Sequence, residues 1–135
     1  MIFKGLEISL SGMLAQRVRI AVGSSNLSNA RSVDENGSPY RRKIPIFESV
    51  LVKEGSLKLY RVKVKEIVED PSPFKEEYDP GNPLADKRGY VKLPNVDPLR
   101  EMVDVMSAIR SYEANLTAFN TNKRMILDAV ELLKA

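Results

Sequence analysis

The fold of this chain is decided by its last stretch, DPLREMVDVMSAIRSYEANLTAFNTNKRMILDAVELLKA at residues 97–135. Large apolar residues recur there at alternating steps of three and four, and only Lys123 interrupts them. This spacing is typical of a heptad seam on one long helix. A helix of about 35 residues would be about 50 Å long, well beyond the average helix of a globular protein. The large residues of the seam are Met102, Val105, Ile109, Tyr112, Leu116, Phe119, Ile126, Val130 and Leu133.

The same helix carries a second apolar stripe, made of smaller residues, roughly on its opposite side. Its members are Val103, Ser107, Ala114, Ala118, Thr121, Met125, Ala129 and Leu132. A surface helix of a globular protein buries a single face. We therefore expect this helix to have partners on two sides.

Residues 2–28 predict a second helix with the same alternation of apolar residues. Three glycines interrupt it, Gly5, Gly12 and Gly23, and each lowers helix stability by about 1 kcal/mol relative to alanine. We expect this helix to be weak in isolation and ordered by packing. Two terminal helices with matching seams indicate an antiparallel coiled-coil hairpin.

The residues between the helices predict strands. Residues 40–48 predict an extended segment, in which Pro45 favours the edge of a sheet. Residues 50–52 predict a further strand. After a glycine turn, the alternation of apolar and charged residues over 57–68 predicts a half-buried strand.

The following segment is rich in proline. Prolines fix φ and remove backbone donors, so residues 70–88 predict an irregular, rather rigid loop. A last short strand is expected at residues 89–94. Asp97 is expected as the N-cap of the C-terminal helix, with Pro98 at the first helical position.

The expected fold class is α+β, a helical hairpin with a small β-rich middle segment that contains prolines. Residues 1–30 form the N-terminal helix of the helical domain, and residues 96–135 form the helix that completes it. Residues 31–95 form the middle segment, which includes the loop at 70–88.

The composition argues against catalysis and metal binding. The chain has no Cys and no His, so it lacks thiolates and the commonest general base and metal ligand. It has no phosphate-binding glycine loop, no nucleophile elbow, and no EF-hand spacing among its loop aspartates. We expect no enzymatic activity, no metal, no cofactor and no small-molecule substrate.

The sequence also bears on location. No run of 18 apolar residues is present, so no membrane insertion is expected. The start, MIFKGLEISLSGMLAQRVRI, lacks the basic start, the continuous apolar core and the small-residue cleavage site of a signal peptide. We expect that any export occurs without cleavage there.

A nucleic-acid-binding module is a competing interpretation. The formal net charge is +3, but the cations are mixed with acidic residues, whereas nucleic-acid binding usually shows a clustered basic face. The one basic run, at 41–43, is expected at a solvated strand edge. Such a module would bind with a steep salt dependence through Arg41, Arg42, Lys43, Lys63 and Lys65.

Assembly is the function that the second apolar faces favour, because contiguous exposed apolar surface marks an interaction site. Two different faces on one subunit would give head-to-tail contacts that propagate as a helical array. A closed coiled-coil dimer is the rival within the same class. We expect the seam inside the subunit at Leu6, Leu10, Met13, Ile20, Val105, Ile109, Tyr112, Leu116 and Phe119. We expect contacts between subunits at Ile8, Ala15, Val22, Asn26, Ala114, Ala118, Met125 and Leu132.

Several motifs resemble those of the bacterial flagellar axial proteins, the family of rod, hook and hook-associated proteins. The N-terminal signature of that family is similar to SGMLAQR at 11–17 and SSNLSNA at 24–30. Within that family, further segments are most similar to those of proximal rod subunits. These segments are PYRRK at 39–43, EDPSPF at 69–74, GYVK at 89–92, EMVD at 101–104 and SYEAN at 111–115.

This resemblance implies a structural subunit of the proximal rod of the flagellar basal body, located in the periplasm. It implies export by the flagellar type III apparatus without a cleaved signal peptide, and polymerisation into a hollow rod that transmits torque. The implied partners are other copies of the chain, other rod proteins and the export apparatus. Another rod or hook protein of the family is the nearer alternative, and the middle segment argues against it.

Overall fold

The computed structural model describes residues 2–134, and Met1 and Ala135, at the ends of the expected terminal segments, lie outside the described residues. Over this range the chain forms a helix, four strands and a second helix, which confirms the α+β class. The elements are α1 (Ile2–Ser28), β1 (Lys43–Glu54), β2 (Leu57–Glu69), β3 (Lys75–Tyr78), β4 (Tyr90–Leu93) and α2 (Pro98–Lys134).

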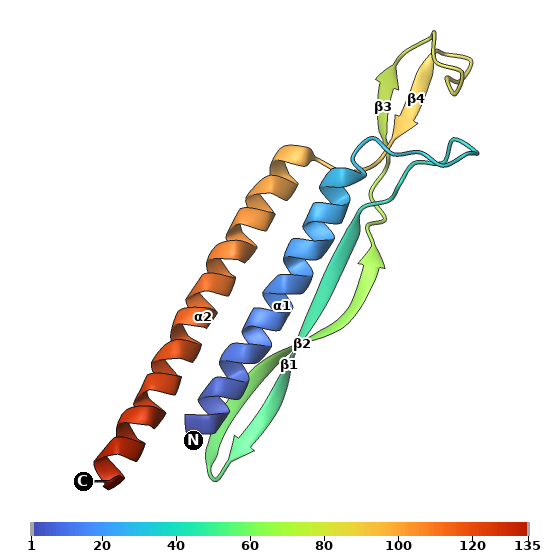
Figure 1. Ribbon diagram of the computed structural model, residues 1–135. Coiled ribbons are helices and arrows are strands. Elements are labelled where there is room, and N and C mark those ends of the chain that lie inside the picture. Colours follow the sequence, from blue (N-terminus) through green and yellow to red (C-terminus); the bar gives the residue numbers. More distant parts are fainter. Residues whose placement is uncertain (1, 135) are drawn as a thin grey trace.

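The molecule is elongated, with three long parts side by side (Figure 1). Helix α1 lies between α2 on one side and the β1–β2 hairpin on the other. The two helices run in opposite directions, so both chain termini lie at the same end (Figure 1). The small β3–β4 hairpin projects beyond the other end, where α1 ends and α2 begins.

The expected helix boundaries are confirmed. Helix α1 ends at Ser28, where the polar run of serines and asparagines begins to favour turns over helix. Helix α2 begins at Pro98, whose missing N–H would have no partner in a first turn. The amide N–H of Glu101 donates to the Asp97 carbonyl at 3.0 Å, which closes that turn.

Strands β1 and β2 form one antiparallel hairpin of 12 and 13 residues. The register shifts between Ile46 and Phe47, as in a β-bulge. Strand β1 pairs only with β2, which is the edge position that Pro45 requires. The backbone N–H of Val62 donates to Ser11 Oγ at 3.2 Å, so one free edge of the hairpin is turned toward α1.

The expectation of an irregular loop over 70–88 is wrong for residues 75–78. These four residues form β3, which pairs antiparallel with β4. Proline restricts its own φ and the residue before it, and the segment between Pro73 and Pro80 is long enough for one short strand. The rings of Tyr78 and Tyr90 pack edge to face at the end of this pair, with ring centroids 5.3 Å apart.

The fully buried apolar core is small. Its described members are Ala15, Val22, Val91, Val96 and Ala108. They come from α1, β4, the segment before α2, and α2 itself, and none is larger than valine. Many larger apolar side chains, such as Leu14, Met102 and Leu132, are exposed. The fold of a single chain therefore leaves much of its apolar surface uncovered.

The two helices approach most closely at glycines of α1. A methyl group added to Gly5 would lie 2.9 Å from Nδ2 of Asn122, and one added to Gly12 would lie 2.6 Å from Oδ1 of Asn115. Real side chains do not approach so closely. The glycines that weaken α1 as an isolated helix are therefore the residues that let α2 pack against it.

Candidate functional site

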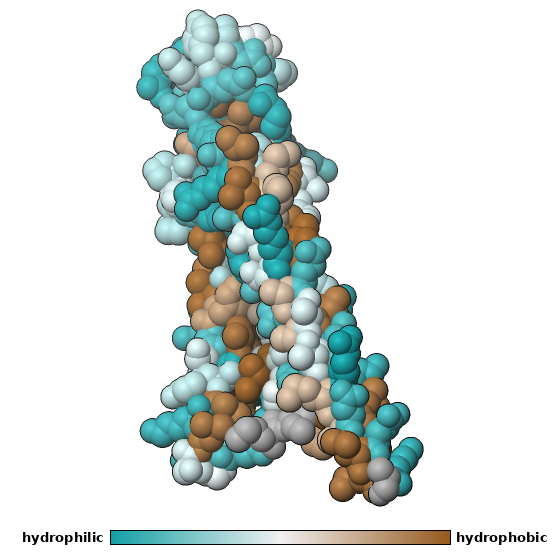
Figure 2. All heavy atoms as spheres, turned by 90° about the vertical axis from the view of Figure 1, so that its left-hand side faces the viewer, coloured by the Kyte–Doolittle hydropathy of each residue, from teal (hydrophilic) through white to brown (hydrophobic). Residues whose placement is uncertain are grey.

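The first candidate site is a set of exposed apolar side chains on α2. We call it the apolar face of α2. Its members are Leu99, Met102, Val103, Met106, Ile109, Leu116, Met125, Leu127, Val130, Leu132 and Leu133. Figure 2, which views the molecule from the α2 side, shows hydrophobic residues recurring along its length among hydrophilic ones. So many exposed apolar side chains on one helix make α2 a candidate interaction surface.

The expected subunit contacts on α2 lie at the surface. Ala114 and Ala118 are exposed, and Met125 and Leu132 are 54% and 78% exposed. They are free to meet a neighbour, and their role there stays a prediction. On α1 the expected contact Ile8 is half-buried.

The other expected subunit contacts on α1 are placed on the wrong face. Ala15, Val22 and Asn26 are 3%, 9% and 1% exposed, and each is covered by other parts of the same chain. The physical reason is contact within the chain. Ala15 and Val22 lie beside residues of the β1–β2 hairpin, which covers this side of α1, and Asn26 is buried because its amide is hydrogen-bonded to Tyr40, Lys43 and Glu101.

The seam expected inside the subunit divides into two groups. Half-buried members are Leu6, Met13, Ile20, Val105, Tyr112 and Phe119. Leu10, Ile109 and Leu116 are exposed instead. Ala108, in contrast, is fully buried. Helix α2 is therefore rotated from the expected orientation, and Asn115, Asn122 and Val105 lie against the glycines of α1.

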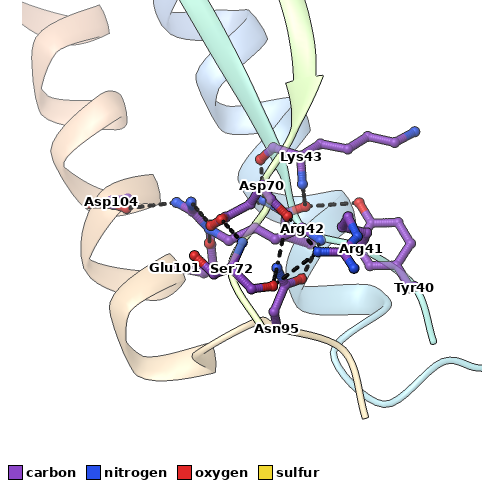
Figure 3. A network of polar contacts seen from close by, with 10 residues as sticks. Tyr40, Arg41, Arg42, Lys43, Asp70, Ser72, Asn95, Glu101 and Asp104 are labelled. Atoms are coloured by element: carbon purple, nitrogen blue, oxygen red, sulfur yellow. Dashed lines mark hydrogen bonds and ion pairs between the residues drawn. The ribbon is translucent and has the colours of Figure 1, made fainter. Parts of the chain in front are cut away.

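The second candidate site is a network of polar side chains where α1 ends and α2 begins (Figure 3). We call it the polar clamp. Its members come from five parts of the chain and are Asn26, Tyr40, Arg42, Asp70, Asn95 and Glu101. Two of them are almost completely buried, since Asn26 is 1% and Glu101 2% exposed.

Both the oxygen and the nitrogen of the Asn26 side-chain amide are hydrogen-bonded. Its Oδ1 accepts from the Tyr40 hydroxyl at 2.8 Å and from the Lys43 backbone N–H at 3.0 Å. Its Nδ2 donates to the Lys43 carbonyl at 2.9 Å and to Glu101 Oε2 at 3.4 Å. The end of α1 is thus tied to the start of β1 and to α2.

Arg42 is the charged centre of the clamp (Figure 3). Its Nε donates to Glu101 Oε1, one guanidinium nitrogen donates to Asp70 Oδ2 at 3.2 Å, and the other lies 3.9 Å from an Asp104 oxygen. Burial by itself would lower the pKa of Arg42, but the hydrogen bonds and negative charges of Glu101 and Asp70 raise that pKa above its ordinary value. The guanidinium therefore stays charged.

Asp70 holds the other side of the clamp. Hydrogen bonds from Ser72, chiefly, and from Arg42 lower the pKa of its carboxyl below the ordinary value. The Asn95 side chain accepts from the Arg42 backbone N–H at 2.8 Å and donates to the Asp70 carbonyl at 3.1 Å. The carbonyls of residues 70 and 72 also accept from Arg41, which lies 4.2 Å above the Phe74 ring.

Sequence reasoning missed this clamp. Arg42 was expected at a solvated strand edge, but its side chain is 19% exposed and paired. The signal was present in the motifs, because PYRRK, EDPSPF and EMVD each supply a member of the clamp and SSNLSNA supplies Asn26. No single motif predicts this, since their positions lie up to 75 residues apart.

The clamp also bears on the nucleic-acid interpretation. Of the five cations proposed for it, Arg42 pairs with carboxylates and Arg41 donates to backbone carbonyls. Lys43, Lys63 and Lys65 are exposed. Two of the three residues in the basic run, Arg41 and Arg42, therefore bind groups of their own chain.

Neither helix, as far as the chain is described, has a stretch long and apolar enough to span a membrane. Residues 2–134 contain no cluster of His, Cys, Asp or Glu side chains that could hold a metal ion.

Comparison with known proteins gives a consistent result. A family model described as the C-terminal region of flagellar basal body rod FlgEFG proteins matches residues 87–132. Flagellar basal-body rod protein FlgC from Aquifex aeolicus (strain VF5) is 50% identical, with 98% of each chain covered. The protein of the same name from Bacillus subtilis (strain 168) is 46% identical over 98% of each chain. That from Escherichia coli O6:H1 is 47% identical over 93% of each chain.

These relatives match nearly the whole chain, including its middle segment. The match confirms the resemblance to proximal rod subunits. It argues against the alternative that the chain is another flagellar axial protein. The chain therefore belongs to the family of flagellar basal-body rod proteins FlgC.

Proposed function

We propose that this chain is a structural subunit of the flagellar basal-body rod and that it polymerises through the apolar face of α2. The observation that carries the proposal is that many apolar side chains of α2 stay exposed on the folded subunit, where they recur among hydrophilic ones (Figure 2). The relatives are named as rod proteins, and a rod is built by subunits that cover each other's surfaces.

The energetics favour association over an exposed monomer. Covering one aliphatic side chain contributes roughly 1.5–3 kcal/mol, and the face holds several side chains of this size. Its two flanks differ, with Met102, Ile109 and Leu116 on one and the alanines near Ala114 on the other. Unlike flanks favour head-to-tail contacts, which extend into a helical array.

Several finer features belong to the same proposal. The subunits would form a hollow rod in the periplasm that transmits torque, after export by the flagellar apparatus without a cleaved signal peptide. The partners would be other copies of the chain and other rod proteins. We expect no catalytic activity.

The pairing of the two helices is proposed to be an antiparallel coiled coil. Buried or half-buried residues on the α1 side of α2 recur at heptad spacing. They are Glu101, Val105, Ala108, Tyr112, Asn115, Phe119, Asn122 and Ile126. The spacing of four and three is the one that keeps a seam turned toward its partner.

The decisive experiment places a charge at Ala118, an exposed position of α2 that is expected to contact a neighbouring subunit. Ala118→Glu should leave the circular dichroism spectrum unchanged and block incorporation into basal bodies, hence motility. The matched control is Thr117→Glu, which adds the same charge one residue away, at an exposed polar position of the same helix. Equal motility of the two variants would count against burial of Ala118 between subunits.

A second measurement separates the rod from a closed dimer. Sedimentation velocity of the purified chain should show larger species growing with concentration. A dimer whose fraction does not change with concentration, with full helicity, would contradict polymerisation.

A further inference from the structure

The contact between α1 and α2 follows a repeat of seven residues. Gly5 and Gly12 are seven apart on α1, and the side chains that lie over them, Asn122 and Asn115, are seven apart on α2. In each pair a small notch on one helix receives an asparagine of the other. Closer to the end of α1, Gly23 meets Val105.

Such a repeat does not define a single alignment. If α2 slid by seven residues in one direction, Asn122 would lie over Gly12 and Ala129 over Gly5. In the other direction, Asn115 would lie over Gly5 and Ala108 over Gly12. Each notch again receives a small side chain, and each seven-residue step moves the helix by about 10.5 Å. The seam alone thus permits alignments one heptad apart.

The polar clamp has no such repeat. Glu101 contacts Asn26 and Arg42 in the observed alignment only. A slide of about 10.5 Å would carry Glu101 out of reach of both and leave Arg42 with Asp70, which lies on the other side of the guanidinium. A buried, fully bonded polar group within an apolar seam is the best attested way to specify helix register.

We propose that the Asn26–Arg42–Glu101 contact is the device that selects the register of α2 on α1 from alignments one heptad apart. The clamp decides where along the subunit the apolar face of α2 is presented, whatever molecule covers that face. This assignment rests on the geometry of a single chain and is independent of the proposed function.

The test uses pairs of spin labels, since the chain has no native cysteine. The labels are attached to cysteines introduced by Arg17→Cys on α1 and Asn120→Cys on α2. Both positions are exposed. Arg17 lies opposite position 110, so the labels are about 15 Å apart along the axis, and a one-heptad slide adds or removes about 10.5 Å. The labelled chain is diluted with unlabelled chain, so that only distances within one chain are read by electron-electron double resonance.

The variant is Glu101→Met, which removes both hydrogen bonds of α2 to the clamp. Arg42 stays paired with Asp70, with Asp104 of α2 at 3.9 Å, and Asn26 stays bonded to Tyr40 and Lys43. The parent should show one distance. Glu101→Met should show a second population at a distance several ångström from the first, because a slide of about 10.5 Å changes the axial part of the separation. Glu101→Gln, which can still accept from Arg42, should restore the single distance. The matched control is Glu113→Met, an exposed glutamate on the same helix, which should behave as the parent.

Two results would overturn the proposal. A single, parent-like distance in Glu101→Met would mean that the seam alone selects the register. Loss of helical circular dichroism in the same variant would mean that the clamp holds the helices together rather than choosing between alignments.

Discussion

The two ends of the helix pair differ in how many of their side chains are buried within the chain. At the end where α1 stops and α2 starts, side chains from five parts of the chain meet in the polar clamp, and Val96 and Pro94 are fully buried beside it. At the other end, Phe3, Leu132 and Leu133 are at least 74% exposed. The clamp end therefore has a buried polar core that the other end lacks, although exposed apolar side chains such as Leu99 and Met102 lie on α2 at that end as well.

This difference indicates how the subunit divides its two tasks. Polar contacts need defined geometry and lose most when one partner is removed, so the clamp end sets the shape of the subunit. Apolar contacts are non-directional and scale with the area covered, so the open end suits contact with a neighbour. Mutations should therefore act on folding at one end and on assembly at the other.

The largest expected effect is at the centre of the clamp. Arg42→Ala would leave the carboxylate of Glu101 buried without its cation, and removal of one partner of a buried pair lowers the free energy of unfolding by about 3–5 kcal/mol. Urea denaturation followed by circular dichroism measures the loss. The control Arg31→Ala removes an exposed ion pair to Glu77 and should change that free energy by about 1 kcal/mol or less. Equal losses would show that the clamp is not the centre of the fold.

The next effect is at the helix contact. Gly12→Val places a side chain against Asn115, and overpacking lowers the free energy of unfolding by about 1–3 kcal/mol even though valine suits a helix better than glycine. Gly81→Val is the control, because a methyl group there has nothing nearer than 4.0 Å. A stabilised Gly12→Val variant would contradict the close approach of the helices.

A smaller effect is expected in the pH dependence of stability. The pKa of Asp70 is lowered in the folded chain, whereas in the unfolded chain it is about 3.9. As the pH falls, the unfolded chain takes up the proton first, so the stabilisation is complete above about pH 4 and is lost as the pH falls through the folded pKa. Asp70→Asn should flatten the fall of unfolding free energy below about pH 4. An unchanged slope would mean that other groups cause it.

The smallest effect on folding is expected at the open end. Leu132→Ser removes a side chain that is 78% exposed, so the unfolding free energy should change by about 0.5 kcal/mol or less. Self-association should weaken, because a buried leucine contributes roughly 1.5–3 kcal/mol. Sedimentation measures the second quantity and denaturation the first. A large loss of monomer stability would place Leu132 in the folded core instead.

The elements of this fold were open to prediction because their signals are local. The three-four alternation and the cap at Asp97 located both helices, and the alternation over 57–68 located β2. Strand β3 was missed because its four residues stand among prolines and carry no apolar period. Its pairing depends on β4, which is 12 residues further along the chain.

The candidate sites were less accessible. Ala118, Met125 and Leu132 were expected at the surface and lie there, but Ala15 and Asn26 were expected at the surface and are buried. The side of α1 with Leu6 and Leu10 and the side with Ala15 and Val22 are both apolar, so periodicity alone does not say which of them is buried within the chain. The choice depends on how closely two backbones can approach, and this is set by Gly5 and Gly12 together with Asn122 and Asn115.

The amino-acid sequence by itself determined the type and extent of the helices and the long strands, since helix caps, glycine turns and hydrophobic period act over a few residues. Its motifs also determined the family. Only the tertiary structure decided which face of each helix turns inward and that Arg42 is buried between Glu101 and Asp70. The physical reason is that steric fit and ion pairing join residues far apart in the chain, and their strength depends on distances that no local pattern contains.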